Sequence, residues 1–337
     1  MTQDAHPADT AELLDSAAKT ALRWHRAGQG AALATVVQTW GSAPRRVGSQ
    51  LVVSGDGRIE GSVSGGCVEG AVIFEAQDAL RDGKHRVLEF GVSDGDAFAV
   101  GLACGGTIRI LVEPIGGTLP ADLLEELVAA QDSRLALAYE VNLNTGVGRL
   151  VRDGYSDRLR LDRSGVEEDG ETFVAVHNPP LRLVVVGAVH IAQALVPMAQ
   201  IAGYDPVVID PRSAFASAER FPGVTLLDDW PDEAVAALGL DARTALVLLT
   251  HDPKLDDPAL EAALAAAQDE ACFYIGALGS KRTHAKRVER LQAAGFSAAE
   301  VARIHGPVGL DIGAAGPAEI AVAILAEMTT VLRKGVA

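Results

Sequence analysis

The sequence has few basic residues, few cysteines and few aromatic side chains. Lysine and arginine number 29 against 45 aspartates and glutamates, so the 337 residues carry a formal net charge of −16. Proteins that bind nucleic acid or anionic lipid normally present a basic face, and no run of this sequence supplies one. We therefore expect no nucleic-acid partner and no membrane partner. A small anionic ligand needs only a few backbone amides and one basic side chain.

Three cysteines are too few for a disulfide framework, and their positions (67, 104 and 272) match no zinc-binding spacing. The first residues are polar and acidic, unlike a secretory signal or a transit peptide. The most apolar stretch, residues 183–199, is interrupted by His190 and Gln193, which argues against a membrane span. We therefore expect a cytoplasmic protein with reduced thiols.

The length of the chain is typical of about two domains. Hydrophobic residues make up 48% of the sequence and aromatics only 4%, which indicates a largely aliphatic core. Asn178 is followed by two prolines, which interrupt any regular element. We place the boundary there and predict an N-terminal domain over residues 1–178 and a C-terminal domain over residues 179–337.

The two halves differ in pattern, and together they predict an α/β protein. In the first half, helical spacing alternates irregularly with short strands, as in a mixed α+β domain. In the second half, the continuous apolar run 183–186 is typical of a parallel strand buried on both faces. Strands at 206–210, 245–250 and 272–275, separated by helices, then predict a Rossmann-like doubly wound parallel sheet.

Two cysteines of the first half each lie beside a pair of glycines. Gly65 and Gly66 precede Cys67 just before a predicted helix, where unpaired amides and the helix dipole favour an anion or a thiolate. Cys104 and Gly105 lie in a similar glycine-rich segment, residues 101–106. We predict that both thiols face one cleft and can act as soft metal ligands. The alternative is that both are small buried side chains beside tight turns.

The second half carries part of a dinucleotide-binding fingerprint. Gly187 follows the buried strand, His190 opens the next helix, and Asp210 ends the following strand, where an acid usually accepts a ribose hydroxyl. Val189 replaces the second glycine, which normally lets the backbone approach a pyrophosphate. The site is therefore either a nucleotide pocket or one that has been altered or lost.

Other residues are expected at the same edge of the sheet, since ligands collect at the carboxyl ends of parallel strands. His251 and Asp252 follow one strand and could form a proton-transfer pair. Another strand is followed by a turn that opens a helix, where amides and basic side chains would form an anion site. The residues of this turn are Gly279, Ser280, Lys281 and Arg282.

Taken in order, these segments resemble the XdhC/CoxI family, the maturation accessory proteins of molybdenum hydroxylases such as xanthine dehydrogenase and CO dehydrogenase. The match covers nearly the whole chain, and it departs from the family at Val189, Ala315 and Gly316. The segments that carry it are residues 41–45, 61–69, 101–106, 250–252, 278–282, 309–313 and 317–321.

The resemblance implies a protein that binds the molybdenum cofactor, as molybdopterin or in its cytosine dinucleotide form. It implies that this protein holds the cofactor during sulfuration by a cysteine desulfurase and passes it to an apo molybdenum hydroxylase. It implies a non-enzymatic chaperone, and we also expect a homodimer.

Two other functions fit parts of the sequence. The Rossmann-like pattern alone would also suit an NAD(P)-dependent oxidoreductase, which would bind its cofactor with turnover. A cysteine hydrolase could use Cys67 together with His190 or His251.

Overall fold

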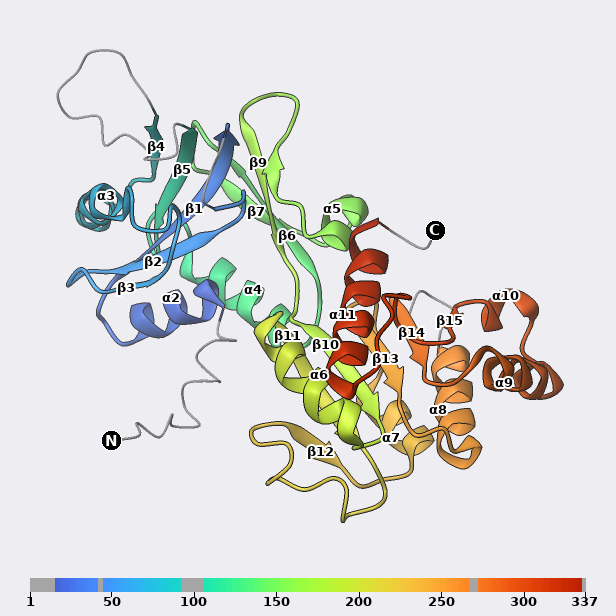
Figure 1. Cartoon of the computed structure of the whole chain (residues 1–337). Helices are drawn as coiled ribbons and strands as arrows, with labels where there is room; N and C mark the ends of the chain where they lie inside the picture. The colour runs from blue at the N-terminus through green and yellow to red at the C-terminus, as the bar shows by residue number, and fades with distance from the viewer. Residues whose placement is uncertain (1–15, 42–44, 92–105, 267–271, 335–337) are drawn as a thin grey trace. The chain divides into compact units, whose positions relative to one another are not determined.

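The structure is a computed structural model that describes residues 16–41, 45–91, 106–266 and 272–334. These residues divide into two compact units, one ending at Pro179 and the other beginning at Pro180 (Figure 1). The first unit contains two sheets and the second contains one, each unit packs its own hydrophobic cores, and each is described separately below.

A five-stranded antiparallel sheet forms the centre of the first unit. Its strand order is β3-β2-β1-β5-β4. The strands are β1 (Ala31–Trp40), β2 (Gln50–Ser54), β3 (Ile59–Gly61), β4 (Arg86–Phe90) and β5 (Thr107–Pro114). Helix α2 (Ala17–Arg26) contributes to the core on one face, and helix α3 (Glu69–Asp82) contributes to the core on the other face.

Strand β1 is buried on both faces because its side chains alternate between these two cores. Ala31 and Leu33 pack into the core that includes α2, whereas Ala32 and Ala34 pack into the core that includes α3. The small and β-branched residues of β1 therefore hold α3, and with it the loop that precedes α3, against a rigid sheet.

A smaller antiparallel sheet completes this unit, with the strand order β7-β6-β9-β8. Its strands are β6 (Leu137–Asn142), β7 (Gly148–Val151), β8 (Gly165–Val166) and β9 (Thr172–His177), with helices α4 (Ala121–Asp132) and α5 (Ser156–Leu161). Tyr139 of β6 donates a hydrogen bond of 2.7 Å to Glu113 of β5, and both side chains are buried.

The second unit contains a six-stranded parallel sheet in the order β12-β11-β10-β13-β14-β15. Numbered within this unit, the order is 3-2-1-4-5-6, that of a doubly wound dinucleotide-binding fold. The strands are β10 (Leu181–Val186), β11 (Tyr204–Ile209), β12 (Thr225–Leu227), β13 (Thr244–Leu248), β14 (Tyr274–Ala277) and β15 (Ile304–His305). The predicted α/β fold class is therefore confirmed.

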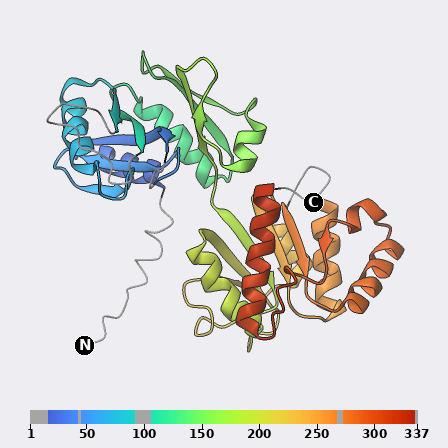
Figure 2. The same ribbon diagram turned by 45° about the horizontal axis from the view of Figure 1, so that its top comes forward.

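Helices cover both faces of this sheet (Figure 2). One core contains Leu183 and Val185 of β10 with residues of α6 and α11, and the other contains Val184 and Val186 with residues of α7, α8 and α9. The helices are α6 (His190–Ile201), α7 (Pro231–Leu238), α8 (Pro253–Ala266), α9 (Lys281–Ala293), α10 (Ala298–Val301) and α11 (Pro317–Lys334). In the described parts of the chain, no helix combines the length and the apolar character needed to cross a bilayer.

One strand begins later than its sequence pattern predicts. The apolar run 272–275 predicts a strand over all four residues, but β14 begins at Tyr274. Cys272 instead has a φ of 70°, in the left-handed region, and its amide donates to the carbonyl of Asp241. Its side chain is buried as expected, although the residue precedes β14 and is not part of the strand.

Candidate functional sites

The loop from β3 to α3 carries the first cysteine motif. Gly65 and Gly66 have φ values of 74° and 110°, which favour glycine strongly. A Cβ on Gly66 would meet no atom within 4 Å, so the backbone conformation rather than crowding requires the glycine. Both glycines are exposed, and the half-buried Cys67 that follows them packs against the core that includes α3.

The carboxylate of Glu69, at the start of α3, organises this loop. Oε1 accepts hydrogen bonds from the Ser62 hydroxyl (2.8 Å) and from the amides of Val63 (3.3 Å) and Ser64 (2.9 Å). Oε2 accepts from the Ser64 hydroxyl and from the amides of Gly66 (2.9 Å) and Val68 (3.3 Å). Burial alone would raise the pKa of Glu69, but the hydrogen bonds from Ser64 and Ser62 outweigh it and lower the pKa to about 2.

The remaining amides of the loop are also paired. Ser62 Oγ accepts from the Gly65 amide at 2.9 Å, and Ser64 Oγ accepts from the Cys67 amide at 3.0 Å. The expectation that these amides are free for an external anion is therefore wrong, because Glu69 and two serine hydroxyls already bind them. What remains for a ligand in this loop is the exposed part of Cys67, whose side chain also packs against the core that includes α3.

The second cysteine motif, with Cys104 and Gly105, lies outside the described residues, so the predicted approach of the two sulfurs stays a prediction. Among the residues that are described, no group of three or more His, Cys, Asp or Glu side chains is placed to hold a metal ion. The only support for Cys67 as a metal ligand among the described residues is therefore its own partial exposure and the loop that carries it.

In the second unit, the fingerprint turn lies between β10 and α6. Gly187 has a φ of 107°, and a Cβ there would lie 2.6 Å from Cγ2 of Thr250, so a larger residue cannot be accommodated. Val189 is the N-cap residue of α6, without a side-chain capping bond, and His190 is the first helical residue and is exposed.

Asp210 follows β11, as predicted, but its carboxylate is fully buried and bound by its own chain. It accepts from the amide of Ala188 at 2.9 Å and from Nε and Nη2 of Arg212 at 2.8 and 2.7 Å. Burial would raise the pKa of Asp210, but the hydrogen bonds from Arg212 and Ala188 lower it. Both oxygens are thus engaged, and Oδ2 fixes the Gly187 turn through the Ala188 amide.

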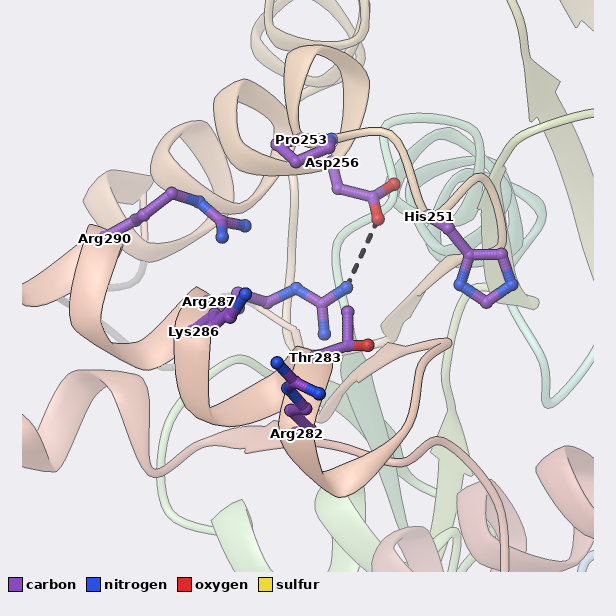
Figure 3. Close-up of a pocket in the computed structure, with 8 residues that line it drawn as sticks. All are labelled: His251, Pro253, Asp256, Arg282, Thr283, Lys286, Arg287 and Arg290. Carbon is purple, nitrogen blue, oxygen red and sulfur yellow. Dashed lines mark hydrogen bonds and ion pairs between the residues drawn. The ribbon is translucent and has the colours of Figure 1, made fainter.

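A basic cavity of about 210 Å³ lies beyond the carboxyl ends of β13 and β14 (Figure 3). It contains two of the predicted site residues, His251 and Arg282. His251 has a φ of 64°, unusual for a residue other than glycine, and its side chain is exposed. The other lining residues are Pro253, Asp256, Thr283, Lys286, Arg287 and Arg290.

The other residues predicted around this edge do not line the cavity. Ser280 caps α9, as predicted, since its hydroxyl accepts from the amide of Thr283 at 3.1 Å. Gly279, with a φ of 146°, forms the turn before it, and Lys281 is exposed. Asp252 has an oxygen that accepts from the amide of Lys254 at 3.0 Å, at the start of α8.

Two important residues of the cavity are not among those predicted from the sequence. Arg287 of α9 and Asp256 of α8 are 1% exposed, and their side chains approach within 3.3 Å. Burial raises the pKa of Asp256, and hydrogen bonds from Thr250 and Arg287 offset only part of that effect. The helical spacing of Arg282, Lys286 and Arg290 is visible in the sequence and indicates one basic face of α9.

Comparison with known proteins gives consistent relatives over nearly the whole chain. A family model described as the XdhC and CoxI family matches residues 24–91, and one described as the XdhC Rossmann domain matches residues 183–328. The chain is 33% identical over 305 residues to the molybdenum cofactor insertion chaperone PaoD of Escherichia coli (strain K12), covering 90% of this chain and 84% of PaoD.

A second relative is described as a probable subunit of xanthine dehydrogenase in Bacillus subtilis (strain 168). It is 28% identical over 318 residues, which cover 88% of this chain and 92% of that protein. Among solved structures, a crystal structure described as a xanthine dehydrogenase from Bacillus halodurans superimposes with a TM-score of 0.71. It shares 24% identity and covers 95% of this chain and 96% of its own, which establishes likeness of fold alone.

Proposed function

The chain belongs to the XdhC and CoxI family, and from that premise we propose that it is a chaperone for the molybdenum cofactor, delivering it to an apo molybdenum hydroxylase. The observation that carries the proposal is the 33% identity to PaoD, which extends over 305 residues and therefore spans both units. A relationship confined to the Rossmann-like unit would support only a shared fold.

The Cys67 loop suits a role in holding this cargo. A thiolate is a soft sulfur ligand, of the same donor type as the dithiolene that binds molybdenum in the cofactor. Gly65 and Gly66 are exposed and carry no side chain, so a bulky cofactor can approach the backbone beside Cys67, which is itself half-buried. The buried carboxylate of Glu69 fixes the backbone on which Cys67 is presented.

The proposal extends to the step before delivery. The chaperone would hold the cofactor while a cysteine desulfurase supplies the sulfur that the hydroxylase requires, and it would act as a homodimer. The proposed cargo is molybdopterin or the cytosine dinucleotide form of the cofactor. Mass spectrometry of the released cofactor distinguishes these two, and size-exclusion chromatography with light scattering measures the oligomeric state.

The two alternative functions gain no support from the geometry. In an NAD(P)-dependent oxidoreductase the acid after the second strand accepts a ribose hydroxyl. Here both oxygens of Asp210 are bound by Arg212 and the Ala188 amide, and the side chain is fully buried. For a cysteine hydrolase, Cys67 belongs to the first unit and both His190 and His251 belong to the second, so neither unit holds the catalytic pair by itself.

Transfer to an apo-enzyme tests the proposal. The wild-type chain, loaded in a host that makes the cofactor, should activate an apo molybdenum hydroxylase, and Cys67→Ser should activate it several-fold less while remaining folded. Cys272→Ser is the matched control, because that thiol is buried in the other unit. Equal activation by wild type and Cys67→Ser would remove Cys67 from the proposal, and no activation by wild type would contradict the function.

A further inference from the structure

The basic cavity of the second unit is lined by more positive charges than the neighbouring carboxylates neutralise. Its lining contains four basic side chains and one carboxylate. Arg290 is paired with Asp257 (Nη2–Oδ1 2.9 Å), and Arg287 is paired with Asp256. Arg282 and Lys286 make no ion pair with any residue that the structure describes. The cavity therefore has an excess of two positive charges, both on exposed and accessible side chains.

Arg287 gives a second and independent indication of a ligand. Its side chain is almost fully buried, and a single nitrogen, Nη2, makes the bonds to Asp256 (3.3 Å) and to the carbonyl of Leu278 (3.0 Å). Within the described ranges, its buried Nε and Nη1 have no hydrogen-bond partner. Buried donors of a charged group are normally paired, because an unpaired one loses the hydrogen bonds that water would give it.

The surroundings of Arg287 favour a compact anion. Figure 3 shows its guanidinium among the lining residues, between α8 and the first turns of α9. The amino end of a helix of 13 residues adds a favourable dipole near Arg282 and Thr283. A guanidinium matches the oxygens of a phosphoryl group with two parallel hydrogen bonds, and a neighbouring ammonium adds charge.

The size of the cavity limits what can enter. At about 210 Å³ it is smaller than the range of about 300–1,000 Å³ typical of sites that enclose a whole small molecule. It can take one charged group, with the rest of any larger ligand lying outside. Asp210 and the Gly187 turn, where a dinucleotide would normally lie, are not among the lining residues.

We propose that this cavity is a phosphoryl-binding site in which Arg282, Lys286 and Arg287 hold the anion. The site lies beside β13 and β14, its lining does not include the fingerprint turn, and it would take either a free phosphate or the phosphate of a larger ligand. It does not depend on the proposed chaperone role, because a chain that carries no molybdenum cofactor could still bind phosphate here.

Calorimetric titration of the full chain with inorganic phosphate and with pyrophosphate tests the site. We expect binding with a Kd of about 1 mM or tighter for at least one of the two anions. Arg282→Gln and Lys286→Gln should each weaken it about tenfold, because each removes one unneutralised charge from the lining. Lys334→Gln removes the same charge from an exposed position at the end of α11 and should change the Kd less than twofold.

Arg287→Lys keeps the charge beside Asp256 but removes the planar fork, so it should fold and bind more weakly than wild type. Binding of either anion that weakens in Arg282→Gln and Lys286→Gln supports the site, and pyrophosphate binding no tighter than phosphate would indicate that the cavity holds a single phosphoryl group. No binding of either anion by the folded wild type would overturn the proposal. So would affinities for wild type, Arg282→Gln and Lys286→Gln that all agree within twofold.

Discussion

Replacing Glu69 with glutamine should loosen the Cys67 loop while leaving its shape unchanged. The carboxylate accepts six hydrogen bonds from Ser62, Val63, Ser64, Gly66 and Val68. In Glu69→Gln one oxygen becomes an NH₂ group, a donor that faces other donors. Either the amides of Val63 and Ser64 or that of Gly66 would then be left without an acceptor, inside a loop whose side chains at positions 63 and 64 are buried.

The size of the effect follows from the pKa of Glu69. Lowering it from 4.5 to about 2 corresponds to about 3 kcal/mol in favour of the ionised, folded loop. Because the pKa is lowered on folding, this stabilisation is present above about pH 4.5 and is lost as the pH falls towards 2. The difference between wild type and Glu69→Gln should therefore be full at pH 7 and about half as large near pH 3.

Hydrogen exchange followed by mass spectrometry measures this directly on a peptide that covers residues 62–70. If the loop opens locally, a loss of about 3 kcal/mol should accelerate exchange of its amides about a hundredfold at pH 7. Glu75→Gln is the matched control on the same helix, since its carboxylate makes a half-exposed ion pair with Arg86 at 3.7 Å and should change little. Unchanged exchange in Glu69→Gln would refute the assignment of Glu69 as the residue that organises the loop.

Three further variants test buried residues of the two units. Burial raises the pKa of Glu113 to about 7, despite the hydrogen bond from Tyr139. The protonated carboxyl therefore stabilises the folded state below about pH 4.5, and this stabilisation is lost as the pH rises through 7. Glu113→Gln should accordingly raise the urea midpoint at pH 8 but not at pH 4, and equal effects at both would contradict this. Asp210→Asn should lower the free energy of unfolding by about 2–3 kcal/mol, because it breaks the ion pair with Arg212. The control Asp205→Asn should lower it by under about 1 kcal/mol, and similar losses in the two variants would contradict the role of the Asp210–Arg212 pair. Cys272→Ser buries a hydroxyl and should cost about 1–3 kcal/mol without lowering cofactor content, and a lowered content would show that it is no neutral control.

The sequence predicts best the elements that are apolar throughout or that begin at clear turn and capping residues. Residues 183–186 are apolar throughout because β10 is covered on both faces, and that pattern has few alternative explanations. The helices after Gly187 and Ser280 begin at His190 and Lys281, where turn and capping residues indicated them. Strand β12 was missed, because its three residues are too few to show a periodicity.

The interactions within the sites could not be predicted in the same way. Glu69 lies next to Val68 in the sequence, but its hydrogen bonds to the amides of residues 63, 64, 66 and 68 depend on how the two glycines fold the loop back over it. Arg287 and Asp256 are 31 residues apart and meet only because β13 and β14 are adjacent in the sheet. Side-chain pairing of this kind depends on tertiary packing, which periodicity does not contain.

The central claim is that this chain carries the molybdenum cofactor, and the content of the purified protein tests it most directly. The wild-type chain is purified from a host that makes the cofactor, molybdenum is measured by mass spectrometry, and the pterin is measured by fluorescence after oxidation. The chaperone role predicts that both co-purify in similar molar amounts and that both fall in Cys67→Ser. Absence of both from the wild-type protein, while molybdenum hydroxylases of the same host are loaded, would contradict the account.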